Sequence, residues 1–164
     1  MKDLIPLAEK IAEVLKSRHE TVGVAESSSG GLISSALLAI PGASAYYLGG
    51  AVVYTLQSRR ALLDLPDSAF AGLRGLTEEL ALVLARGARQ RFATTWAISE
   101  VGAAGPTGSR FGDPPGTSCI AVAGPAERAM IIRTGNSDRA ANMRAFAARA
   151  LELLSECLGA GSNA

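Results

Sequence analysis

A short β-branched segment that runs directly into a serine- and glycine-rich turn constrains this chain more than any other feature. Residues 21–25 (TVGVA) predict a buried strand, because β-branched residues are enriched in strands. Residues 26–31 (ESSSGG) follow at once, and the apolar segment 32–40 predicts a helix that stops before Pro41. A strand, a tight turn and a helix in this order favour an open α/β sheet, whose ligands bind beyond the carboxyl ends of its strands.

The rest of the chain alternates helical and strand patterns in the same way. Helices are expected over residues 4–18, from Thr77 to about 92, and over about 138–157, with a short turn or helix at 59–65. Further strands are expected at 46–54, 94–101, 117–123 and 130–134.

These elements indicate an α/β fold with helices on both faces of a sheet of about five strands. A short Gly-Pro turn joins the last two strands, so at least one strand pair should be antiparallel. No repeat or linker interrupts the order. The 164 residues therefore predict a single domain, with an N-terminal helical segment in 1–20 and a frayed tail at 159–164.

Composition excludes several classes of protein. The formal net charge is +1 and no basic run occurs, so no nucleic-acid partner is expected. With a single histidine and two cysteines, Cys119 and Cys157, we expect buried thiols, no metal site and no cofactor. The N-terminus lacks a signal peptide and no apolar run approaches the ~20 residues of a spanning helix. A cytoplasmic protein without a membrane partner is expected.

The turn at 26–31 is the first candidate site. Three consecutive serines offer hydroxyl donors, the two glycines let a ligand approach the backbone, and the following helix N-terminus offers free N–H groups. A phosphate or a carboxylate would suit such a place. An ordinary serine cap beside a glycine turn explains the same residues.

The turn at 41–44 (PGAS) is the second candidate, because Ser44 in a sharp turn can be an exposed nucleophile. It needs a base, and the only histidine, His19, lies in or just after the first helix, so a Ser-His-Asp triad is not expected. A lysine could replace the histidine, but no lysine follows Lys16. The alternative is a turn serine that bonds its own backbone.

The loop at 102–108 (GAAGPTG) is the third candidate. It follows a strand, so it lies at the same sheet edge as the first turn if the two strands are parallel, and its amides could bind an anion or a carbonyl oxygen. A mobile connector is the alternative. Arg133, Arg139 and Arg144 could bind a phosphate or form a solvated face. Trp96 is expected in the core.

The ordered set of motifs resembles the CinA C-terminal domain family, whose stand-alone members are nicotinamide-nucleotide amidases. The family's E-S-C-T-G-G is similar to ESSSGG at 26–31, and its P-G-S-S, aromatic, G-G, Y-S-N-x-x-K run is similar to residues 41–60. A V-S-E-E-x-A helix start is similar to LTEELA at 76–81. G-I-A-G-P-x-G and P-x-G-T are similar to residues 102–108 and 114–117, and a final G-x-R is similar to residues 137–139. The likeness covers almost the whole chain.

The resemblance implies a three-layer α/β/α sandwich with a mixed, mostly parallel sheet. It implies metal-free hydrolysis of the carboxamide of nicotinamide mononucleotide (NMN) to nicotinate mononucleotide and ammonia, with a small nucleotide as ligand; a homodimer is also expected. Carried over, the catalytic residues are Ser44, Tyr54 and, at the position of the family lysine, Arg59. The substrate-binding residues would be Glu26, Ser27, Ser28, Ser29, Gly30, Gly31, Gly49, Gly102, Ala104, Gly105, Arg139 and Arg144.

Some positions differ from the family pattern. Arg59 replaces the lysine, and a guanidinium stays protonated, so it is a poor general base. The alternative function is therefore a catalytically impaired paralogue that binds a nucleotide. Glu100 replaces an apolar residue and Val101 a hydroxyl residue. Glu100 could be a replacement base or merely a surface charge.

Overall fold

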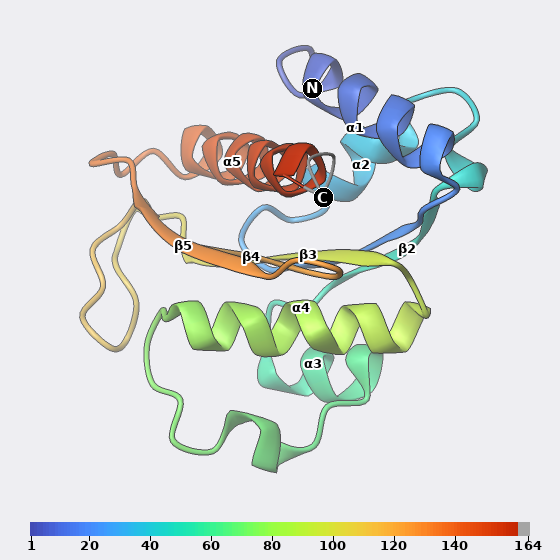
Figure 1. The fold of residues 1–164 in the computed structure, drawn as a ribbon. Helices are drawn as coiled ribbons and strands as arrows, with labels where there is room; N and C mark the ends of the chain where they lie inside the picture. The colour runs from blue at the N-terminus through green and yellow to red at the C-terminus, as the bar shows by residue number, and fades with distance from the viewer. Residues whose placement is uncertain (161–164) are drawn as a thin grey trace.

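A five-stranded mixed sheet forms the centre of the computed structural model, which describes residues 1–160 (Figure 1). The strands lie in the order β2-β1-β3-β4-β5. β1 pairs in parallel with β2 and β3, whereas β4 is antiparallel to β3 and β5. The expected mixed sheet and its antiparallel last pair are confirmed. The strands are β1 (Val22–Glu26), β2 (Tyr47–Val52), β3 (Trp96–Ala103), β4 (Thr117–Ala123) and β5 (Arg128–Arg133).

Helices cover both faces of the sheet, which makes the three layers that the resemblance implied (Figure 1). One layer holds α1 (Ile5–Arg18), α2 (Leu32–Leu38) and α5 (Arg139–Ala160). The other holds α3 (Leu56–Leu63) and α4 (Glu78–Phe92). None of the helices among residues 1–160 is both long enough and apolar enough to span a bilayer.

The two faces of the sheet carry side chains of different size. Val24, Ile98 and Ile120 belong to the core that packs against α1, α2 and α5. Ala97 and Ala121 belong to the core on the α4 side. Successive residues of a strand point to opposite faces of the sheet. α4 therefore packs closely against small side chains, whereas α1, α2 and α5 pack against larger apolar ones.

Local hydrogen bonds decide where several helices begin. Thr77 Oγ1 accepts the Leu80 amide at 3.1 Å, which confirms the expected cap of α4. α3 begins at Leu56, before the expected residue 59, because Thr55 and Ser58 cap each other through side chain and backbone.

Two further expectations concern buried residues and the tail. Trp96 is 2% exposed and its Nε1 donates to Glu20 at 2.7 Å, so its core position is confirmed. Cys119 and Cys157 are buried free thiols, and burial raises the pKa of Cys119 to about 12. In the expected tail, residues 159 and 160 continue α5, whereas 161–164 lie outside the described residues.

Candidate functional site

Two buried glutamates lie side by side on neighbouring parallel strands, one of them at the carboxyl end of its strand. Glu26 ends β1 and Glu100 lies directly beside it in β3, as partners in the strand register. Both side chains are fully buried. The turn at 27–31 leaves β1 at this point, so the expected convergence of that turn with the end of the third strand is confirmed.

Glu26 holds the start of α2. Its carboxylate accepts the Ser29 hydroxyl at 2.8 Å, the Ile33 amide at 3.1 Å, and the Ser34 amide and hydroxyl at 3.1 and 2.6 Å. Free amides at a helix start need an acceptor, and a carboxylate is the strongest one that a side chain supplies. The protein's own glutamate therefore takes the place that the sequence suggested for a bound anion.

Glu100 holds the turn itself. Oε2 accepts the amides of Ser27 at 3.2 Å and Ser29 at 2.8 Å, and Oε1 accepts the hydroxyls of Ser28 at 3.0 Å and Ser118 at 2.9 Å. Burial raises the pKa of Glu100, and these donors oppose that rise. The alternative of a surface charge is wrong, because the side chain is fully buried.

A cavity of about 650 Å³ opens next to this pair of strands. One wall is apolar and is formed by residues that precede α4 or begin it, such as Leu73, Leu76 and Leu80. Polar residues such as Ser27, Thr55 and Ser109 also belong to the lining. The lining residues are Ser27, Tyr54, Thr55, Leu56, Arg59, Phe70, Leu73, Gly75, Leu76, Leu80, Val101, Gly102, Ser109, Arg110 and Phe111.

A second cavity of about 310 Å³ adjoins the first and lies along the glycine-rich loop at 102–108. Tyr54, Gly102, Ser109 and Arg110 line both cavities. The second cavity also reaches Ser28, Ala103, Ala104, Gly105, Thr107, Gly108 and Arg139.

Arginines make the two cavities electropositive. Arg59 donates from Nε to the Val53 carbonyl at 3.3 Å, and its guanidinium lies 5.9 Å from the Phe70 ring centre. Burial, and then the charge of Arg110, lower the pKa of Arg59. Neither lining contains an acidic residue in the described part of the chain. The arrangement suits an anion beside a flat apolar group.

The loop between the cavity and α5 is fixed by side chains of α5. Arg139 Nη1 donates to the Gly105 carbonyl at 2.8 Å, and Asn142 Nδ2 donates to the Ala104 carbonyl at 2.8 Å. Gly105 has φ 110°, and a Cβ there would lie 2.5 Å from the Ser137 carbonyl oxygen. Only glycine fits this position without displacing backbone.

Most of the residues carried over from the resemblance gather here. Those that line a cavity are Ser27, Ser28, Tyr54, Arg59, Gly102, Ala104, Gly105 and Arg139. Glu26, Ser29, Gly30 and Gly31 build the turn behind the cavities.

Three of the expected residues lie elsewhere. Ser44 is exposed in the 3₁₀ turn Ala43–Ala45, which precedes β2 and so lies at the amino end of that strand, whereas Tyr54 follows its carboxyl end. Within one chain, Ser44 does not reach the cavities. Gly49 packs against Phe92, and Arg144 is exposed on α5.

The sequence patterns missed other members of the site. Arg110 and Phe111 come from a loop without any regular pattern, and Phe70 from the 3₁₀ turn Asp67–Phe70. Asn142 had a usable signal, because it is a polar residue on the buried side of an otherwise apolar helix and is 1% exposed.

The fold and the site together define a class: a three-layer α/β domain with arginine-lined cavities at the carboxyl ends of parallel strands. Residues 4–158 match the model of the CinA C-terminal domain. The chain belongs to the CinA C-terminal domain family, as its motifs indicated.

Relatives with curated descriptions agree with this assignment. A CinA-like protein of Salinibacter ruber is 34% identical over 148 residues, which cover 90% of this chain and 36% of the relative. A CinA-like protein of Myxococcus xanthus is 38% identical over 157 residues, which cover 92% of this chain and 36% of the relative. The chain thus spans little more than a third of these relatives.

Solved structures show the same architecture. The competence/damage inducible protein CihA of Agrobacterium tumefaciens superposes with a TM-score of 0.87 at 30% identity, over 96% of both chains. A CinA superfamily protein of Klebsiella pneumoniae superposes with a TM-score of 0.88 at 25% identity, over 95% of this chain and 98% of the other.

Proposed function

We propose that this chain is a metal-independent amidohydrolase that converts the carboxamide of NMN, or of a closely related nucleotide amide, into a carboxylic acid and ammonia. The observation that carries the proposal is the larger cavity, in which Arg59 and Arg110 lie beside an aromatic and aliphatic wall. The two guanidiniums would bind the phosphate, and the wall would hold the pyridine ring. A volume of about 650 Å³ is within the range of small-ligand sites.

The direct test is ammonia release from NMN by the purified protein. Turnover supports an amidohydrolase. Arg59→Lys is the informative variant, because a desolvated lysine can lose its proton and a guanidinium cannot. Higher turnover in this variant would identify Arg59 as the group that limits the reaction. Arg60→Lys is the matched control, since Arg60 is exposed and pairs with Asp67 outside both cavities.

A second candidate function is nucleotide binding without turnover, and it is favoured by Arg59 itself. A protonated guanidinium can hold a phosphate but cannot accept the proton of a nucleophile. This candidate predicts no ammonia, together with thermal stabilisation by NMN. At a ligand concentration one hundred times Kd, binding adds about 2.7 kcal/mol, which raises Tm by roughly 5–10 °C for a chain of this size. No stabilisation by any pyridine nucleotide would contradict both functions.

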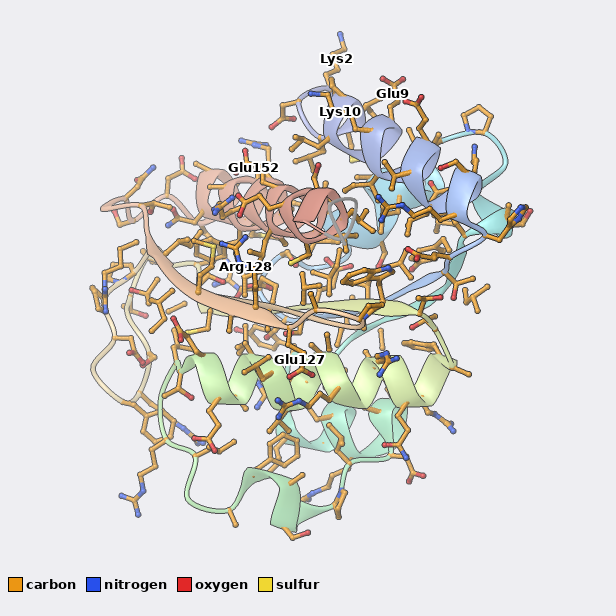
Figure 2. The ribbon with its side chains drawn as sticks, in the orientation of Figure 1. Lys2, Glu9, Lys10, Glu127, Arg128 and Glu152 are labelled. Carbon is orange, nitrogen blue, oxygen red and sulfur yellow. The ribbon has the colours of Figure 1, made fainter. Side chains whose placement is uncertain are left out.

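We further propose a homodimer in which the β2 edges of two copies pair antiparallel across a two-fold axis. β2 is an edge strand with the sequence YLGGAV, which contains no charge and no proline. Exposed apolar side chains gather on it and just beyond it: Leu48, Val52, Tyr54 and Leu56. The other edge strand carries charge: Arg128, labelled in Figure 2, lies at the start of β5. Its guanidinium pairs with Glu156. An open apolar edge favours pairing with a second copy.

Leu48→Lys tests this dimer. A lysine on an edge strand opposes strand pairing, so we expect the mass of the variant in sedimentation to fall from dimer to monomer at micromolar concentration. Leu62→Lys is the matched control, because Leu62 is 44% exposed on α3 and Leu48 is 49% exposed. A wild-type protein that sediments as a monomer, or a dimer that Leu48→Lys leaves intact, would contradict the proposal.

A further inference from the structure

Ser28 lies between a buried carboxylate and a cavity. Its hydroxyl donates to Glu100 Oε1 at 3.0 Å, and the residue lines the smaller cavity. On the far side, Glu100 is fully enclosed by protein. A serine that lines a cavity and whose hydroxyl is hydrogen-bonded to a fixed carboxylate has the arrangement of a nucleophile and its base.

Of the serines around Glu100 in the described residues, Ser28 is the one that meets both requirements. Ser118 Oγ also donates to Glu100 but does not line either cavity. Ser29 donates its hydroxyl to Glu26 instead. Ser27 lines the larger cavity, but its contact with Glu100 is made by the backbone amide.

We propose that Ser28 is a nucleophile and Glu100 its general base, and that this pair is the acyl-transfer centre of the site. For an amide substrate this rests on the proposed function. The proposal gives the hydrolytic role to a residue pair other than Ser44 and Arg59.

The proposed reaction balances in two steps. Ser28 Oγ attacks the carboxamide carbon while its proton passes to Glu100, the C–N bond breaks, and the leaving nitrogen takes a proton from a water molecule in the cavity, which becomes hydroxide. That hydroxide attacks the ester on Ser28, and the acid leaves as Oγ takes its proton back from Glu100. The loop at 102–108 borders the same cavity, and its backbone amides would bind the substrate oxygen.

The surroundings of Glu100 fit the role of a base. Each carboxylate oxygen accepts two hydrogen bonds, so the group is held in one orientation with Oε1 toward Ser28. Burial raises the pKa of Glu100, which makes the carboxylate a stronger base than an exposed one. Ser118 supplies a second hydroxyl to the same oxygen and would hold the carboxylate in place when the proton of Ser28 moves.

The test uses a fluorophosphonate probe, which needs no knowledge of the substrate. Oγ of an activated serine attacks phosphorus, fluoride leaves, and the proton passes to the base. We expect peptide mass spectrometry of the full chain to find one adduct, on Ser28, and Ser28→Ala to abolish it. Ser35→Ala is the control, because Ser35 is exposed on α2 and lies outside both cavities.

Glu100→Gln removes the base and is expected to slow labelling by about 100-fold or more. Because that change disturbs four hydrogen bonds, Glu100→Asp serves as a second variant that keeps the buried charge but draws it back from Ser28, with an expected loss of about tenfold or more. Circular dichroism establishes that each variant is folded.

Three results would overturn the proposal: no adduct on the wild-type protein, an adduct on Ser44 that persists in Ser28→Ala, or wild-type labelling rates in a folded Glu100 variant. The outcome is separable from that of the proposed function. If Ser28 is labelled but no ammonia is released from NMN, the Ser28–Glu100 pair is supported and NMN is excluded as the substrate. If the Ser28→Ala variant still releases ammonia from NMN, the amidohydrolase function is supported and the Ser28–Glu100 pair is contradicted.

Discussion

Replacing Glu26 with alanine is expected to lower the free energy of unfolding by about 3 kcal/mol or more. The change leaves the Ser29 hydroxyl and the Ile33 amide without their acceptor in a buried place, and the amide and hydroxyl of Ser34 without theirs in a half-buried one. Each buried donor without a partner costs about 1–3 kcal/mol, and partial relaxation keeps the sum below simple addition. For a chain of this size, 3 kcal/mol corresponds to a fall in Tm of roughly 6–12 °C.

Thermal and urea unfolding of Glu26→Ala measure this loss. Glu9→Ala is the matched control, because Glu9 is exposed on α1 (Figure 2), and we expect it to change the unfolding free energy by less than about 0.5 kcal/mol. A loss below about 1 kcal/mol in Glu26→Ala would mean that water replaces the carboxylate, and that the turn at 27–31 does not depend on it.

The second large effect is expected on binding. Arg110→Ala should weaken the affinity for NMN by about 10- to 100-fold, since a hydrogen bond to a charged partner contributes about 1.5–3 kcal/mol. Arg110 lines both cavities, so its loss removes positive charge from each. Arg59→Ala should act in the same direction and should also expose the Phe70 ring that its guanidinium covers.

Calorimetric titration of NMN into each variant measures this effect. Arg60→Ala is the control, because Arg60 is adjacent in sequence yet pairs with Asp67 at the surface. We expect Kd of the wild-type protein to rise with salt and that of Arg110→Ala to rise less, since screening acts on the charge that was removed. If Arg60→Ala and Arg110→Ala change Kd for NMN equally, the phosphate does not bind beside Arg110.

The sequence predicted the elements well where a pattern is local. Residues 21–25 are β-branched and apolar, and they form β1; Thr77 precedes two acids and caps α4. Patterns of this kind follow from the chain's own geometry over a few residues. No local pattern predicts that Glu100 is buried, because its partner Ser118 lies on a strand that is distant in the sequence.

The candidate site was predicted only in part. The turn at 27–31 and the loop at 102–108 meet because β1 and β3 are parallel, which is the condition under which the sequence predicts their meeting. Arg110 and Phe111 reach the cavity through an irregular loop, whose path no local pattern encodes. The misplacement of Ser44 was avoidable: the expected strand at 46–54 already separated Ser44 from Tyr54 by up to roughly 30 Å of extended chain.

The placement of charge around the cavities has a consequence for any ligand that carries both signs. Guanidiniums of Arg59 and Arg110 border the larger space and those of Arg110 and Arg139 the smaller one, whereas the carboxylate of Glu100 lies behind Ser28 and borders neither. The electric field therefore points from the arginines toward the glutamate. An anionic group has its lowest energy beside Arg110, which borders both spaces, so the field draws the anionic tail of such a ligand there and favours a cationic end that points away from the arginines.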